Sequence, residues 1–332
     1  MPVLNFFIDK NHFPYKYVND LDFDNKELLA QLGSANTWLL WTLRTYMELN
    51  GLYTCNLTDT IPDSGIAIFF RGSIELAAKP NKKQFWVCIV ADGVWHPYSQ
   101  VNLFQNYQQH SKYPHSYFMR HWHQLNIIKS NSGNLRPKNI CYFGDELNLA
   151  PELRTDDWKD FLKLNGFTFI IPDYSKWNDY ADIDIVIGIR SFSSDDFLNK
   201  PSSKLINAWR AETVFIGGND SAFEYERQTE FDYIKVVSYS GLKEILLKLK
   251  QDESLYHTYK SRAAVCGERF PDKLFTEQWV KVIDEVISPG YMRYLTANYF
   301  TYKYFIISRF LIYRAEALGV RFKRYSRKFR TK

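Results

Sequence analysis

Lysine and serine residues surround the start of one predicted helix, in the segment KPSSKLINAWRAE (residues 200–212). The helix is expected to begin at Ser202 or Ser203, with Lys200 and Lys204 beside its first turn. Because the free amides at a helix start carry partial positive charge, this arrangement favours an anion such as a diphosphate. Arg190 ends the preceding strand, IDIVIGI, and adds a cation. The alternative interpretation is an ordinary serine-capped helix with its lysines in solvent.

A second group of residues could deprotonate a hydroxyl. In IVADGVWHPYSQ, Asp92 and His96 follow a predicted strand, and either is a candidate general base. The alternative is an aspartate in a turn and a histidine in the packing. Asp63 and Arg71 flank another predicted strand, GIAIFF, and have the same two interpretations.

No metal site is expected. His121 and His123 alternate in RHWHQL without a third ligand nearby, and DIDIV lies inside the start of a strand instead of forming an acidic triplet beside one. The four cysteines have no CxxC spacing, which predicts free thiols in a reducing compartment.

The elements that position these residues form two series, in a chain of 332 residues that is long enough for two domains. A helix is predicted over Ser34 to Gly51, and short apolar runs come before and after it: FFID, LYTCNL, GIAIFF and FWVCIVAD. After the linker-like SNSGNLRPKN, five more runs alternate with helical patterns: NICYFG, FTFII, IDIVIGI, TVFIGG and YIKVV. Such alternation predicts parallel, doubly wound sheets.

We therefore expect an α/β protein with two Rossmann-like lobes that face each other across a cleft. Residues 1–130 would form the N-terminal α/β domain, residues 131–290 the C-terminal α/β domain, and residues 291–332 a basic helical tail. In open parallel sheets, ligands bind outside the carboxyl ends of the strands, where the candidate residues above are predicted to lie.

The run KPSSKLINAWRAETVFIGGNDSAFEYE resembles the donor-binding region of glycosyltransferases with the two-domain GT-B fold. In that family a segment with Lys and Ser precedes a helix of the form KLxxAxxA, which leads to a strand, a small-residue turn and a short helix with a glutamate. CYFGDEL and YIKVVSYSGLKEILLKL are similar to neighbouring parts of the same lobe. The resemblance covers roughly Lys138 to Leu249, and the N-terminal half is matched only in architecture. It implies that residues 131–290 form the nucleotide-sugar-binding domain and residues 1–130 the acceptor-side domain.

The resemblance implies a transfer of sugar from a nucleotide-sugar donor to a glycan or lipid-linked glycan, without cofactor or metal, in cell-surface polysaccharide biosynthesis. It places the donor diphosphate near the residues of the helix start and its cations: Arg190, Lys200, Ser202, Ser203 and Lys204. It assigns further donor contacts to turns and a short helix: Gly144, Gly217, Gly218, Ser221, Ala222 and Glu226.

Two departures limit what the resemblance implies. Many retaining members carry two glutamates seven residues apart, but the residue seven before Glu226 is Asn219, so inverting chemistry is preferred. Glu212 and Thr213 replace the usual small-residue and proline step, which leaves the sub-family open.

The C-terminal segment differs from the rest of the chain. Residues 291–332 contain twelve aromatic residues, and from Arg293 onward eleven Lys or Arg accompany one acid, Glu316. They predict amphipathic helices on an anionic membrane surface. The alternative is a helix that returns to pack on the first lobe. With no signal peptide and no run of eighteen apolar residues, we expect a cytoplasmic protein, peripheral on the inner face of the membrane.

Two other functional classes compete. A nucleotide-sugar epimerase or dehydrogenase also uses doubly wound lobes, but no GxGxxG follows a candidate strand. A non-catalytic nucleic-acid or membrane binder needs a basic face across a folded domain, whereas the chain before Arg293 has 31 basic and 36 acidic residues. No nucleic-acid partner is therefore expected.

Overall fold

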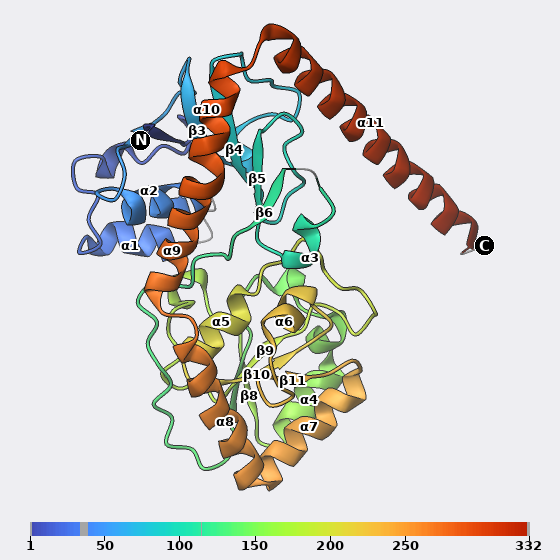
Figure 1. The fold of residues 1–332 in the computed structure, drawn as a ribbon. Coiled ribbons are helices and arrows are strands. Elements are labelled where there is room, and N and C mark those ends of the chain that lie inside the picture. The colour runs from blue at the N-terminus through green and yellow to red at the C-terminus, as the bar shows by residue number, and fades with distance from the viewer. Residues whose placement is uncertain (1, 34–38, 114, 331–332) are drawn as a thin grey trace.

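Two parallel β-sheets organise the chain, one in each half (Figure 1). The computed structural model describes residues 2–33, 39–113 and 115–330, and of residues 30, 31, 33, 317 and 320–330 it describes the backbone alone. The first sheet ends at Phe118 and the second begins at Asn139, so SNSGNLRPKN lies between them except for its last residue, Asn139.

The first sheet has the strand order β2-β1-β3-β4-β5-β6, with every neighbouring pair parallel. Its strands are β1 Leu4–Phe7, β2 Cys55–Thr58, β3 Gly65–Phe70, β4 Gln84–Ile89, β5 Val101–Phe104 and β6 Ser116–Phe118. β4 and β5 are buried along their whole length, as parallel strands covered on both faces are. The four predicted apolar runs correspond to β1 through β4, whereas β5 and β6 lie in segments without a predicted strand.

The second sheet has the order β11-β10-β9-β7-β8, again with all pairs parallel. Its strands are β7 Asn139–Cys141, β8 Thr168–Ile170, β9 Ile185–Gly188, β10 Val214–Gly217 and β11 Ile234–Lys235. All five match predicted runs. In both sheets the second strand lies outside the first, so the winding reverses between β1 and β3 and between β7 and β9. Ligands bind at such reversals, beyond the carboxyl ends of the strands.

The helices between strands cover the sheets. In the first lobe they are α1 Lys26–Gly33, α2 Arg44–Leu49 and α3 Tyr107–His110, and in the second they are α4 Asp156–Leu164, α5 Ser203–Arg210, α6 Ser221–Glu226, α7 Tyr239–Gln251 and α8 Glu253–Glu268. The helix predicted from Ser34 consists of a π-helical turn, Leu39–Leu43, followed by α2, and its Ser34 cap lies outside the described residues. Its predicted end is confirmed, because Gly51 follows with φ +98°, a backbone conformation that glycine tolerates best.

After α8 the chain returns to the first lobe. Figure 1 shows α8, α9 (Asp272–Val282) and α10 (Ser288–Thr296) leading from the second lobe to the first. The hydroxyl of Tyr53 donates a hydrogen bond of 2.9 Å to Asp284, and Phe85 packs edge-on against the Tyr294 ring. This part of the chain therefore stabilises the first lobe, as the alternative interpretation of the C-terminal segment expects.

The last helix, α11 (Tyr299–Arg330), contacts the first lobe between Tyr302 and Glu316. The Tyr302 hydroxyl donates to the Pro80 carbonyl oxygen at 2.9 Å, and the Trp95 indole donates to Glu316 at 2.7 Å. The C-terminal end of the helix lies clear of both lobes (Figure 1). Among the helices of the described residues, none has the length and apolar character needed to cross a membrane.

A buried carboxylate joins the linker to the second lobe. Asp184, which precedes β9, is fully buried and accepts hydrogen bonds of 2.8 Å from the backbone amides of both Lys138 and Asn139. Its other oxygen accepts from the Ser132 hydroxyl at 2.6 Å and from the Tyr256 hydroxyl at 3.3 Å. One side chain thus connects the linker, β7, β9 and α8.

We expect Asp184→Asn to lower the free energy of unfolding by about 2–3 kcal/mol, because an amide has only one acceptor oxygen. With that oxygen on the two backbone amides, the NH₂ group would face the donors that now bind Oδ1, from Ser132, Asn134 and Tyr256, and the negative charge would be lost. Asp182→Asn is the matched control, since this neighbouring carboxylate is exposed. Urea unfolding followed by circular dichroism measures both. Equal stability of the two variants would contradict a structural role for Asp184.

Candidate functional site

A cleft of about 410 Å³ lies between the lobes, where the carboxyl ends of β3 and β4 face those of β7 and β9. These strand ends include the reversal of winding in the second sheet, where ligands of doubly wound sheets bind. Several predicted site residues line the cleft together: Asp92, Gly144, Arg190, Lys200, Ser203 and Lys204.

The start of α5 forms one wall of the cleft. Ser203 and Lys204 line it directly, while Ser202 is buried behind them. The Ser202 side chain does not cap the helix, because its hydroxyl donates instead to Glu226 at 3.3 Å. The first-turn amides of α5 therefore keep their hydrogen-bonding capacity for a ligand.

Lys204 sits close to the turn that follows β7. Its ammonium lies 5.2 Å from the centre of the Tyr142 ring, and a Cβ atom at Gly144 would come within 2.7 Å of its Nζ. A larger residue at position 144 would therefore require the Lys204 ammonium to shift. Burial lowers the pKa of Lys204 to about 7, and the positive charge of Arg190 adds to the shift, whereas Asp220 opposes it.

Arg190 is held by a buried carboxylate. Its Nε donates to the Asp220 Oδ1 at 2.9 Å, and the Asp220 side chain is fully buried. Burial raises the pKa of Asp220, while the neighbouring guanidinium lowers it. The pair fixes Arg190 at the end of β9 with its charge directed at the cleft that it lines.

The first lobe contributes an aspartate and a histidine. Asp92 follows β4, and its Oδ2 accepts from the Lys200 ammonium across the cleft at 2.7 Å. His121 also lines the cleft, although its sequence context suggested only a metal ligand. Its Nδ1 contacts the Trp122 carbonyl oxygen, which only accepts, so Nδ1 carries the proton and Nε2 is an acceptor. Burial lowers the pKa of His121 to about 4, which keeps the ring neutral.

Aromatic rings complete the cleft, and no sequence motif pointed to them. Trp41 packs edge-on against His121, with ring centres 3.9 Å apart, and Phe143 stacks on Tyr180 at 4.1 Å. Trp177 lines the same wall as Phe143. Cations beside aromatic surfaces suit a ligand that combines a charged group with flat or apolar faces.

Other predicted residues lie outside this cleft. His96 is fully buried in the first lobe, where its Nε2 lies 3.0 Å from the Glu75 carbonyl oxygen. Arg71 binds the carbonyl oxygens of Val94 and Ile74 and so supports the turn that carries Asp92. The exposed Asp63 does not line the cleft.

The turn and short helix assigned to the donor by resemblance lie at the boundary between the lobes. The Ser221 hydroxyl accepts from the Asn106 side-chain amide of the first lobe at 2.9 Å. Glu226 forms a bidentate pair with Arg120, at 2.8 and 3.0 Å. Gly217 and Gly218 close β10 and Ala222 is buried in α6; none of the three lines the cleft. Both polar side chains thus join the lobes.

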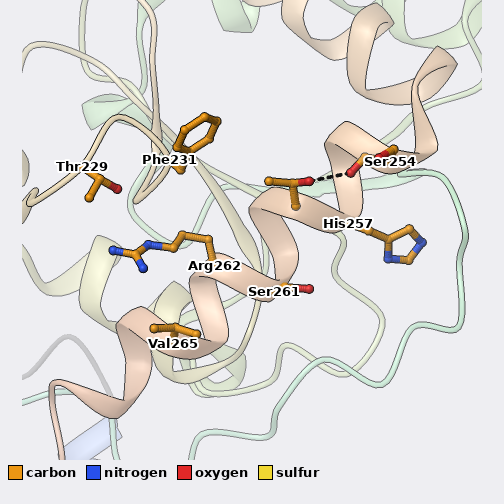
Figure 2. Close-up of a pocket in the computed structure, with 8 residues that line it drawn as sticks. Thr229, Phe231, Ser254, His257, Ser261, Arg262 and Val265 are labelled. Atoms are coloured by element: carbon orange, nitrogen blue, oxygen red, sulfur yellow. Dashed lines mark hydrogen bonds between the residues drawn. The ribbon is translucent and has the colours of Figure 1, made fainter.

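A second hollow, of about 660 Å³, lies on α8 and the loop before β11 (Figure 2). Its cation, Arg262, is paired with Asp232, with Nε and Oδ1 2.9 Å apart. The Thr258 hydroxyl is used within the helix, where it donates to the Ser254 carbonyl oxygen at 2.8 Å. Within the described part of the chain, no three His, Cys, Asp or Glu side chains are grouped to hold a metal. The interlobe cleft is therefore the better candidate site.

Comparisons with protein-family models and with curated proteins find no match. Among solved structures, HepE from Anabaena in complex with UDP and glucose is similar at 8% sequence identity and a TM-score of 0.51, over 86% of this chain and 100% of HepE. The HepE complex with UDP gives 9% identity with the same coverage and TM-score.

TarM from S. aureus is 11% identical with a TM-score of 0.47, over 72% of this chain, which spans only 57% of the length of TarM. At such identities the likeness extends to the fold and not beyond it. The two parallel-sheet lobes and the similarity to HepE agree with the resemblance found in the sequence: this chain has the GT-B fold of nucleotide-sugar glycosyltransferases.

Proposed function

We propose that this protein is a glycosyltransferase that moves a sugar from a nucleotide-sugar to a hydroxyl of a glycan or lipid-linked glycan. The observation that carries the proposal is the convergence of Arg190, Lys200, Lys204 and the start of α5 in a GT-B cleft, opposite Asp92 and His121. HepE, with the same fold, binds UDP and glucose, which makes UDP the first nucleotide to test.

The mechanism follows from the charges on the two walls. The cations of the second lobe and the α5 amides would bind the donor diphosphate and stabilise the negative charge that develops on it as the sugar leaves. Asp92 would accept the proton of the acceptor hydroxyl, and the Nε2 of His121 would accept a hydrogen bond that orients a substrate hydroxyl. With Asn219 in place of a second glutamate, direct displacement with inversion is the preferred stereochemistry.

The competing enzyme class fits the site less well. Nucleotide-sugar epimerases and dehydrogenases hold a dinucleotide on a glycine-rich turn. Here the turn after β7 reads FGDEL, with a single glycine, and the space above it is occupied by the Lys204 ammonium.

The cellular setting is also proposed: polysaccharide biosynthesis at the cytoplasmic face of the membrane, with α11 as the peripheral contact. The helix exposes a stripe of apolar side chains at alternating spacings of four and three, which places them on one face. They are Phe300, Tyr304, Ile307 and Leu311, from 57% to 81% exposed. Basic residues accompany the stripe, and the side chains of those after Arg314 lie outside the described part. Rings and cations on one helix suit an anionic lipid surface.

The first prediction concerns the start of α5. Lys204→Ala and Ser203→Ala should weaken UDP binding, because each removes a hydrogen bond to the diphosphate. For Lys204 we expect a loss of about 1.5–3 kcal/mol, roughly ten- to a hundredfold in Kd. Titration calorimetry measures this, with the surface variant Lys159→Ala as control. Unchanged affinity in both variants would refute the diphosphate site.

The second prediction follows from the lowered pKa of Lys204, about 7. Below that pH the ammonium is already charged; above it, binding a diphosphate requires uptake of a proton. The Kd for UDP should therefore rise roughly tenfold between pH 6.5 and pH 8.5. Lys204→Arg keeps its charge throughout this range and should remove most of the dependence. The same pH profile in both proteins would show that Lys204 is not the titrating group.

The third prediction concerns α11. A chain that ends at Glu316 keeps the contact with Trp95 but lacks the last seven basic residues. If only three of them reach an anionic surface, their loss removes about 3 kcal/mol, roughly a hundredfold in binding. Flotation with vesicles of phosphatidylserine and phosphatidylcholine tests this.

Ile307→Asp with Leu311→Asp tests the apolar stripe in the full-length chain and should also release the protein from vesicles. Both variants should still bind UDP, because these positions lie on α11 and not in the cleft. Vesicle binding as strong as that of the wild type in both would exclude the membrane role.

A further inference from the structure

The ion pair between Asp92 and Lys200 joins the acceptor wall of the cleft to the donor wall. The carboxylate comes from the turn after β4, and the ammonium comes from the loop before α5, with 2.7 Å between Oδ2 and Nζ. Each side chain is therefore engaged by the other.

We propose that the Asp92 carboxylate occupies the place of a donor phosphate at Lys200 while the cleft is empty, and that a bound diphosphate displaces it. This inference rests on the proposed function and adds to it the order in which the donor binds and the base becomes available. The carboxylate becomes free to accept a proton only after the donor has bound.

The turn that carries Asp92 is built to present it. Ala91, a buried residue before it, has φ +50°, a backbone conformation that costs a non-glycine residue energy and recurs at functional sites. The turn is closed by a hydrogen bond from the Gly93 amide to the Val90 carbonyl oxygen at 3.0 Å. A Cβ atom at Gly93 would lie 3.0 Å from the Arg71 side chain, so the turn is packed tightly.

The main chain of Lys200 is tied down independently of its side chain. Its carbonyl oxygen accepts from the Asn106 side chain at 3.1 Å, and its amide donates to the Phe197 carbonyl oxygen at 2.9 Å. The backbone from which the ammonium extends therefore stays beside the cleft when the partner of the ammonium changes. Only the side-chain contact with Asp92 has to break.

The exchange is favourable for a diphosphate. The Asp92 side chain is 54% exposed, and partly exposed ion pairs of this kind contribute little to stability. A diphosphate has more negative charge and more acceptor oxygens than one carboxylate. It also gains Arg190 and Lys204, whose charges act on the same space, since Arg190, Asp92 and Lys200 all shift the pKa of Lys204.

Displacement leaves Asp92 beside the acceptor wall. Its negative charge acts on His121, whose pKa it raises against the larger effect of burial, and both side chains line the cleft. A carboxylate that no longer neutralises Lys200 is a stronger acceptor for a proton of a hydroxyl. Donor binding thus prepares the base for the second substrate.

The test is the affinity of the Asp92→Asn protein for UDP and for inorganic diphosphate. Removing the competing carboxylate should tighten both by about two- to fivefold, the range expected for an exposed ion pair, while sugar transfer is lost. Asp145→Asn is the matched control, because this carboxylate lines the same cleft but accepts from the Leu147 amide at 2.9 Å instead of from Lys200. The increase in affinity caused by Asp145→Asn should be less than half of the increase caused by Asp92→Asn.

A second pair of variants tests whether the gain requires Lys200. In a Lys200→Met background, adding Asp92→Asn should leave the Kd for inorganic diphosphate unchanged. Melting temperatures of all variants monitor folding, and Asp92→Ala provides a second removal of the carboxylate. Unchanged or weaker binding by both Asp92 variants, or an equal gain without Lys200, overturns the inference.

The outcomes separate this inference from the proposed function. Wild-type protein that binds UDP, without a gain in the Asp92 variants, would refute the displacement and leave the glycosyltransferase proposal intact. A gain for inorganic diphosphate, in a protein that transfers no sugar from any nucleotide-sugar, would support the displacement and refute the enzyme class. Protein that binds neither ligand overturns both.

Discussion

The cleft depends on a charged contact between the lobes, the pair of Arg120 with Glu226. Glu226 is 4% exposed, and its two oxygens are both engaged by the guanidinium. Because an unpaired charge would be costly at that depth, each residue requires the other to stay in place. The Arg120 guanidinium also lies over the rings of Phe118 and Tyr225, one from each lobe. Together these contacts set how far apart the donor and acceptor walls lie.

Much of the fold was predictable, because it follows from local patterns. All five strands of the second sheet are short β-branched or aromatic runs, and each is bounded by a turn or a helix. The strands β5 and β6 were missed because they are four and three residues long and stand among polar residues. α8 was missed because its buried face has few apolar residues: the buried side chains among its 16 residues are Tyr256, Ala263 and Cys266.

The candidate site was predictable mainly on the donor side. The start of α5 can be predicted from a few consecutive residues, because its serines and lysines are neighbours in the sequence. Asp92 was proposed as a base, but its contact with Lys200 spans 108 positions, and the pair of Arg120 with Glu226 spans 106. No local pattern specifies such pairs. His121 was seen as an isolated histidine, because the walls that bury it come together only in the folded chain.

The chain passes between the lobes twice, and the two crossings lie side by side. His123, just before the first, and Asp272, at the second, approach to 2.8 Å between Nε2 and Oδ1. Bodies connected at one place have a single hinge, so any swing of the lobes turns about this point. The swing would part Asn106 from Ser221 while leaving each sheet intact. The route of the backbone therefore determines the axis about which the cleft would open or close.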